Sequence, residues 1–98
     1  MSVYLISRFK IHDRALYDKY EDLFMPTFEN SGGTLLSVDE EPRVLQGEWE
    51  HTRSVLIEFP DKESAFAWMM SPEYQAIAKY RLEGSEGQSI MVKGMDPA

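Results

Sequence analysis

The sequence predicts an α+β fold with elements in the order β-α-β-β-α-β, the ferredoxin-like or split βαβ arrangement. Three observations lead to this prediction. Short apolar runs with strand periodicity occupy residues 2–11, 34–39, 53–60 and 88–94. Two longer segments, residues 13–33 and 62–82, read as helical, and the first repeats its apolar residues at helical spacing. Proline, glycine and N-cap residues mark the boundaries between elements. We therefore expect an antiparallel sheet with both helical segments on one face.

The first expected strand, residues 2–11, is apolar on both faces. Val3, Leu5 and Phe9 alternate to one side, and Tyr4 and Ile6 alternate to the other. An antiparallel strand with one solvated face normally alternates apolar and polar residues. The strand at residues 53–60 is also apolar on both sides, so both faces of the sheet should be covered.

The first helical segment begins at Asp13, a favourable N-cap, and should end at Gly32 and Gly33. Pro26 lies inside it. A proline in a helix interior removes a hydrogen bond and costs about 3 kcal/mol. We therefore expect a kink at Pro26, or a break into two helices.

The middle of the chain contains an interrupted strand. Residues 34–39 form the second strand, and Glu40, Glu41 and Pro42 interrupt it. Residues 43–47 either continue this strand or form a short hairpin. Pro60 should end the next strand, because proline cannot donate to the hydrogen-bond ladder.

Two helix starts follow that strand. Asp61 can cap a helix at residues 62–70. Ser71 then supplies a second N-cap, with Pro72 at the first helical position and Glu73 in the first turn, near the positive end of the helix.

The second of these helices should run to about Leu82. A loop at residues 83–87 and the last strand should follow. The periodicity of the strand and of the helix places several residues on the buried faces, and these should form the core: Val55, Ile57, Phe59, Ala65 and Trp68.

Length and composition limit the classes of function. The 98 residues should form one domain spanning residues 1–98. The net charge of −7, from 10 basic and 17 acidic residues, repels phosphate backbones, so nucleic acid is not an expected partner. With no cysteine, the chain has no disulfide, thiolate zinc site or cysteine nucleophile.

No apolar run approaches the roughly 20 residues of a membrane span. The apolar stretch before Arg8 is too short for a signal-peptide core. The sequence therefore predicts a cytoplasmic protein with no membrane partner. The second face of the sheet still needs a cover, and the simplest cover is a second copy of the same sheet, in a two-fold homodimer.

Motifs along the chain resemble a known family. They are "D…Y..Y…GG" near the start, "G.W…R.V.IEFP" in the middle, "SPEYQ", and then Arg81. From Val3 to Gly94 the chain resembles domain-of-unknown-function family 1330, in the dimeric α+β barrel superfamily.

The resemblance implies a ferredoxin-like monomer and a homodimer whose sheets face each other. It implies no particular reaction. Relatives in the superfamily include cofactor-free monooxygenases, isomerases and decarboxylases, as well as haem-using members, and an analogy of fold alone does not assign a function.

Trp49, His51 and Arg53 alternate, so they share one strand face if that stretch is extended. They are either an aromatic wall, an acid–base imidazole and an anion clamp, or a rim tryptophan with two solvated side chains.

Glu58 lies in an otherwise apolar strand. A buried carboxylate must be paired, or its pKa rises. We expect Glu58 to be buried beside an arginine and to reach a cleft bordered by Trp49. It is either a general base or half of a structural ion pair inside the dimer.

Tyr17, Tyr74 and Arg81 either line a cleft between helices and sheet or belong to the core and its rim. His12 precedes the helix cap, and the two histidines have no short metal-binding spacing, so no metal site is predicted.

Two hypotheses of function remain open. In the first, the homodimer holds a small acidic or aromatic molecule beside Trp49, Arg53 and Arg81. Glu58 and His51 are then the candidate catalytic residues, and no cofactor is involved. In the second, the dimer is a non-catalytic structural or regulatory module. An enclosed cavity favours the first hypothesis, and a collapsed interior favours the second.

Overall fold

The sheet is built around its first strand. β1 (Val3–Ile11) pairs antiparallel with β3 (Arg53–Phe59) on one side and with β4 (Ser85–Lys93) on the other, and β2 (Thr34–Asp39) pairs antiparallel with β3. The computed structural model describes residues 1–95, and over these residues the sheet has four strands in the order β2-β3-β1-β4.

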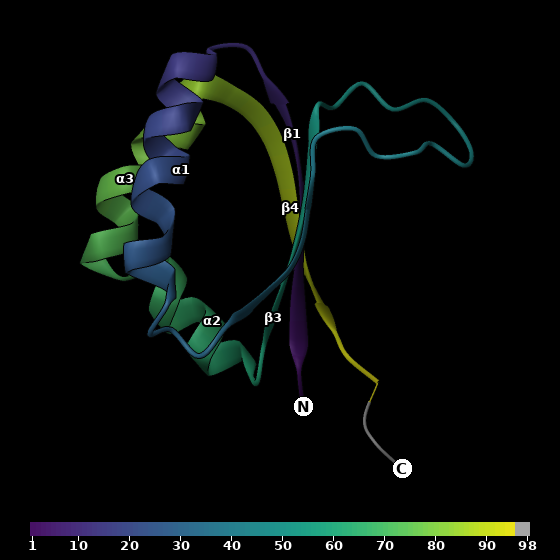
Figure 1. Ribbon diagram of the computed structural model, residues 1–98. Helices are drawn as coiled ribbons and strands as arrows, with labels where there is room; N and C mark the ends of the chain where they lie inside the picture. The colour runs from purple at the N-terminus through teal and green to yellow at the C-terminus, as the bar shows by residue number, and fades with distance from the viewer. Residues whose placement is uncertain (96–98) are drawn as a thin grey trace.

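The helices form a second layer on one face of the sheet (Figure 1). They are α1 (Arg14–Phe28), α2 (Lys62–Met69) and α3 (Pro72–Gly84). This arrangement confirms the α+β class and the antiparallel sheet that the element order predicted.

The core lies between the two layers. In β3 every second residue is buried, from Arg53 to Phe59, and these side chains face the helices. Burying apolar area on one sheet face against amphipathic helices is the main source of stability in such a fold. The expected core residues are all buried there: Val55, Ile57, Phe59, Ala65 and Trp68.

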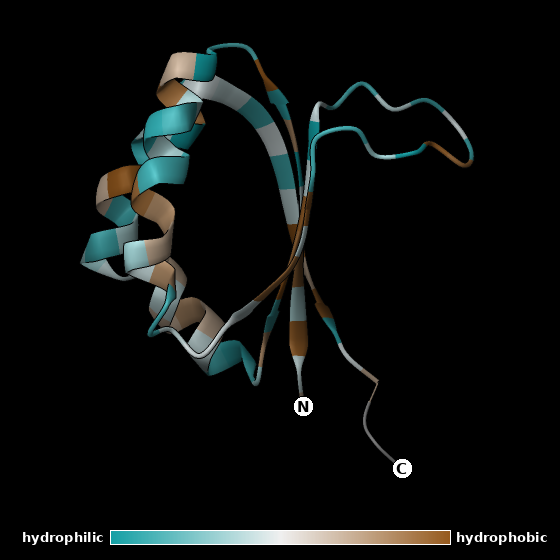
Figure 2. Ribbon diagram, in the orientation of Figure 1, coloured by the Kyte–Doolittle hydropathy of each residue, from teal (hydrophilic) through white to brown (hydrophobic). Residues whose placement is uncertain are grey.

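No helix covers the other face of the sheet within residues 1–95 (Figure 1). Tyr4 and Ile6 of β1 and Leu56 of β3 lie on this outer face, as does Ile90 of β4, which pairs with Ile6. Ile6 is 42% exposed and Ile90 is 58% exposed. The middle parts of the strands are hydrophobic (Figure 2). Because Ile6 and Ile90 are exposed, apolar side chains remain on a face that the helices do not reach.

The expected break at Pro26 is wrong. α1 is one helix from Arg14 to Phe28 with Pro26 inside it, and the backbone N–H of Glu29 closes the last turn on the carbonyl of Met25 at 2.9 Å. Because Pro26 lies in the last turn, only one intrahelical bond is missing and almost no helix follows. The helix therefore ends before the glycine pair rather than at it.

Two expectations about loops are also wrong. Residues 40–52 neither continue β2 nor form a hairpin. They form an irregular segment, which projects from the sheet on the side away from the helices (Figure 1). The expected loop at residues 83–87 is largely strand, because β4 begins at Ser85 directly after α3. Gly87 permits this pairing with β1, since a Cβ there would collide with the ring of Phe9.

The N-caps agree with the sequence. Asp13, Asp61 and Ser71 each accept a backbone N–H of the following helical turn. Pro72 lies at the start of α3, where its missing N–H costs nothing. No helix in residues 1–95 is long and apolar enough to cross a membrane.

Replacing Ser71 by Ala should lower the free energy of unfolding by about 1 kcal/mol. The Ser71 hydroxyl accepts the N–H of Tyr74 at 3.2 Å and donates to the carbonyl of Trp68 at 2.7 Å, so it joins the ends of α2 and α3. Urea denaturation measures the change. Ser71→Asp keeps the cap acceptor and should unfold closer to the wild type. Identical midpoints for all three proteins would show that the cap contributes nothing.

Candidate functional site

A cavity of about 630 Å³ lies between the helices and the sheet. Every strand and every helix described above contributes to its wall, from Leu5 of β1 to Met91 of β4. Its size falls within the range of about 300–1,000 Å³ that is usual for small-molecule sites. The interior of the fold is therefore not collapsed.

One end of the cavity is aromatic and apolar. Trp68 of α2 lies with its ring centroid 4.3 Å from that of Tyr74 and 5.7 Å from that of Phe24. Met69 and Met70 complete this part of the wall. Methionine and aromatic side chains make an adaptable apolar surface for a ligand.

The other end is cationic. Arg53, the first residue of β3, faces the helices and is 9% exposed. Its guanidinium lies 5.2 Å from the ring centroid of Tyr17. The guanidinium of Arg81, on α3, lies 5.5 Å from the ring of Phe9 and 5.9 Å from the ring of Tyr20. Both arginines are thus held against aromatic faces that also line the cavity.

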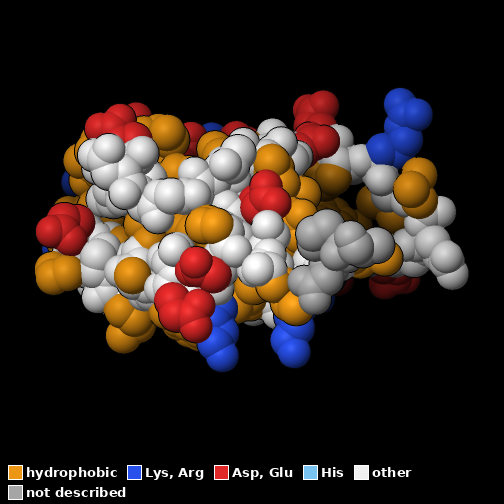
Figure 3. All heavy atoms as spheres, turned by 90° about the horizontal axis from the view of Figure 1, so that it is seen from below, with side chains coloured by type: hydrophobic (Ala, Val, Ile, Leu, Met, Phe, Trp, Pro, Cys, Tyr) orange, Lys and Arg blue, Asp and Glu red, His pale blue; other side chains and the backbone are white. Residues whose placement is uncertain are grey.

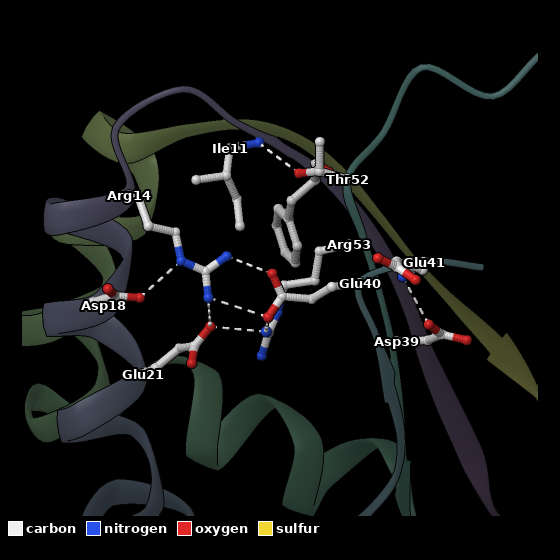
Figure 4. Close-up of polar contacts among 10 residues, drawn as sticks. Ile11, Arg14, Asp18, Glu21, Asp39, Glu40, Glu41, Thr52 and Arg53 are labelled. Atoms are coloured by element: carbon white, nitrogen blue, oxygen red, sulfur yellow. Dashed lines mark hydrogen bonds and ion pairs between the residues drawn. The ribbon is translucent and has the colours of Figure 1, made fainter.

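The two arginines differ in their counter-charges. Arg53 donates to Glu21 of α1 at 2.8 Å and to Glu40, just beyond β2, at 3.2 Å. Arg14 also pairs with Glu40 and lies 3.5 Å from Glu21 (Figure 4). For Arg81, no carboxylate of residues 1–95 lies within 4.0 Å.

Two tyrosines at this site, Tyr17 and Tyr20, are protonated at neutral pH. Burial raises the pKa of Tyr17 to about 12, and burial also raises the pKa of Tyr20 above its ordinary value. The hydroxyls of Tyr20 and Tyr74 are 2.8 Å apart and share a hydrogen bond. Tyr17 and Tyr20 therefore do not supply a base, and the Tyr17 hydroxyl can donate a hydrogen bond to a ligand.

Four of the residues selected from the sequence line this cavity together: Tyr17, Arg53, Tyr74 and Arg81. The other three lie elsewhere. The ring of Trp49 lies 5.7 Å from the guanidinium of Arg8 on the outer face of β1, and His51 lies 5.2 Å from Trp49. Because β3 begins only at Arg53, residues 49–52 are not strand, and the expected shared face of Trp49, His51 and Arg53 is not present.

The expected environment of Glu58 is also wrong. Its carboxylate is half-buried on the outer face of the sheet, where the Tyr4 hydroxyl donates to it at 3.2 Å. Tyr4 is its cross-strand neighbour in β1. Strand alternation is the physical reason: Ile57 and Phe59 face the helices, so Glu58 between them must face away from the cavity.

Sequence reasoning missed two residues of the cavity wall that bear on its chemistry, Glu21 and Trp68. Glu21 follows Tyr17 by one helical turn, and this spacing places both on one face of α1. That signal was readable from the sequence. Trp68 was assigned to the core, which is correct, but the cavity beside it depends on how the layers pack.

A family model matches residues 2–95, and its description is "Domain of unknown function (DUF1330)". The chain belongs to the DUF1330 family. The resemblance read from the motifs is thereby confirmed. Among curated proteins, no relative matched.

Solved structures share the fold of this DUF1330 protein. A protein of unknown function from Rhodopseudomonas palustris is 16% identical with a TM-score of 0.81, and the match covers 98% of this chain and 84% of the other. A dimeric protein of unknown function and ferredoxin-like fold from Bacteroides fragilis is 16% identical with a TM-score of 0.67, covering 95% and 96%.

SnoaB, a cofactor-independent oxygenase from Streptomyces nogalater, is 14% identical with a TM-score of 0.63, and the match covers 98% of this chain and 95% of SnoaB. At these identities the likeness shows the fold alone. Within residues 1–95, no group of three or more His, Asp or Glu side chains gathers where it could hold a metal ion.

Replacing Glu40 by Gln should lower the free energy of unfolding of this DUF1330 protein. The decrease should be largest at neutral pH and smallest in acid. A hydrogen bond from Arg14 is the main reason that the pKa of Glu40 lies below its usual value. A carboxylate whose pKa is lowered by folding stabilises the folded state above its unfolded-state pKa, and this contribution is lost as the pH falls. Urea denaturation between pH 7 and pH 3 should show the two proteins converging.

Glu41→Gln is the matched control, because Glu41 is exposed and no arginine of residues 1–95 pairs with it. It should follow the wild-type pH profile. A constant difference between wild type and Glu40→Gln at every pH would contradict the ionic role of Glu40.

Proposed function

We propose that this DUF1330 protein is a homodimer that binds a small organic molecule in the cavity between the helices and the sheet. The observation that carries the proposal is the cavity itself, about 630 Å³ in volume, with an aromatic end and a cationic end. A largely apolar pocket with a few convergent polar groups is the usual form of a ligand site. A purely structural module has no use for such a space, because voids destabilise a core.

The wall suits an organic molecule with an apolar body. Leu5, Val55 and Ile57 present aliphatic surface from the sheet, opposite Phe24 and Trp68 from the helices. Apolar burial contributes roughly 25 cal/mol per Å² to binding before the entropic cost of association. Exposed Phe66 and Met70 also belong to the wall, so the site extends to the molecular surface.

The outer face of the sheet supports the homodimer. Ile6, Leu36 and Ile90 are each more than 40% exposed, and Tyr4, Leu56 and Val92 lie half-buried around them. Residues 40–52 project to the same side of the sheet (Figure 1), and Leu45 in that segment is 89% exposed. Figure 3 shows the lower end of the molecule rather than this face, and hydrophobic side chains also lie among charged ones there. A second copy of this chain would cover this surface, as expected of a self-complementary two-fold interface.

Binding, rather than turnover, is the role that the described residues support. Glu21 is the carboxylate in the cavity wall, and it is paired with Arg53 and Arg14. Glu58 and His51, the catalytic candidates from the sequence, lie beyond the sheet. A general base must be within hydrogen-bond reach of the proton that it removes. The proposal therefore assigns neither of them to chemistry in the cavity, and it involves no cofactor.

The test follows the indole signal of Trp68, which lines the cavity, in nitrogen-15 NMR spectra. Adding either 2-naphthoate or 2-naphthamide should shift this signal and leave that of Trp49 in place, because Trp49 lies on the outer side of the sheet. The Trp49→Phe variant assigns the two signals. The proposal fails if neither compound moves the Trp68 signal at millimolar concentration, or if only Trp49 responds.

A matched pair of variants locates the binding site. Val38→Phe adds a ring at the cavity wall and should weaken the binding of both compounds, because the ring occupies space that the ligand needs. Val44→Phe makes the same change at an exposed position outside the wall and should leave binding unaltered. Equal effects of the two substitutions would contradict the location.

The dimer has a separate test in analytical ultracentrifugation. The wild type should sediment at twice the chain mass of 11.3 kDa at micromolar concentration. Ile6→Glu, on the outer face, should dissociate the dimer, because it places a charge in the apolar interface. Leu23→Glu, on an exposed part of α1, is the control and should remain dimeric. A monomeric wild type would remove this part of the proposal.

A further inference from the structure

Arg81 is the cationic group of the cavity that has no anionic partner within residues 1–95. Arg53 carries two carboxylates, Glu21 and Glu40, within 3.2 Å. Around Arg81, residues 1–95 provide aromatic side chains instead: the rings of Phe9 and Tyr20, and the polar side chain of Tyr74. Ring faces attract a guanidinium, but more weakly than a carboxylate that bonds two of its N–H groups. One positive charge in this wall is therefore not neutralised by a carboxylate of the described residues.

The hydrogen-bonding groups near Arg81 also favour an anionic ligand, because several of them are donors without an acceptor in the described residues. The Nε–H of Arg81 and the Nε1–H of Trp68 are buried and have no acceptor in residues 1–95. Such donors are costly to leave unpaired in a protein interior. The hydroxyl of Tyr17 remains protonated through neutral pH, which makes it a further donor. The carboxylate that could accept from them, Glu21, is engaged by arginines. The wall thus offers donors and positive charge near Arg81, while acceptors elsewhere on it, such as the side-chain oxygen of Gln75, are neutral.

We propose that the cavity selects a small aromatic acid with a single negative charge, whose anionic group pairs with Arg81 and whose ring lies toward Trp68 and Met69. This inference rests on the proposed function and narrows its ligand class. A planar carboxylate matches the fork of the guanidinium and can accept two of its N–H groups. The aromatic body then occupies the apolar end of the same cavity.

The charge of the whole chain favours a single negative charge on the ligand. With a net charge of −7, the protein repels anions at long range, so local pairing with Arg81 must overcome that field. A second charge on the ligand would add to the repulsion. It would also find Arg53 already neutralised by Glu21 and Glu40.

The experiment compares 2-naphthoate with 2-naphthamide, which have nearly the same shape but differ in charge. Isothermal titration calorimetry should show the wild type binding naphthoate about tenfold more tightly or better, as expected for a charge-assisted pair. Added sodium chloride should leave the affinity for naphthamide unchanged, because the amide carries no charge. This comparison needs no variant, so it stands even if substitutions at Arg81 disturb folding.

Arg81→Gln should remove the preference for naphthoate, because its affinity for naphthoate should fall to that for naphthamide. Its affinity for naphthamide should stay within about twofold of the wild-type value, because only the charged pair is lost. Lys79→Gln removes the same charge from an exposed position on the same helix and should preserve the preference. Equal binding of the two compounds to the wild type would overturn the inference. So would a loss of both compounds in a folded Arg81→Gln protein. Failure of both compounds to shift Trp68 would instead overturn the proposed function itself.

Discussion

Aromatic contacts between the helix layer and the sheet are the constraint on which the rest of the structure depends. Phe59 of β3 is fully buried, and its ring lies 5.9 Å from Phe28 of α1 and 5.7 Å from Trp68 of α2. Phe28 and Trp68 are themselves 5.3 Å apart. Large rings in edge and tilted contact fix the distance between layers more firmly than flexible aliphatic chains do. The two layers meet closely around these rings, and a cavity remains beside them.

The sheet separates two environments with different chemistry. On the helix side, alternate strand residues line the cavity together with tyrosines and two arginines. On the outer side, Glu58 bonds to Tyr4, and Arg8 lies against Trp49. Because strand residues alternate between faces, one register decides which side each group occupies. Neighbours in sequence such as Ile57 and Glu58 therefore belong to different surfaces and serve different roles.

The ion-pair network connects segments that no backbone ladder joins. Arg14 and Glu21 are on α1, Glu40 opens the projecting segment, and Arg53 begins β3 (Figure 4). Most of these groups are partly exposed, so each single pair contributes little to stability. Their value is positional: they hold Arg53 in the cavity wall while cancelling its charge. Arg81 has no such network among residues 1–95, and this contrast gives the cavity its remaining positive character.

The sequence by itself determined the element order, the helix caps, the faces of β1 and β3, and the core at Phe59 and Trp68, because these follow from local periodicity and capping chemistry. The tertiary structure alone decided the partners of the charged residues. Glu58 lies apart from the cavity arginines Arg53 and Arg81 because strand parity turns it away from the helices. Trp49 is separated from Arg53 because the strand starts only at Arg53. Pro26 stays within one helix because it falls in the last turn. The cavity is a property of how two layers pack, and no local pattern in a sequence encodes the space left between them.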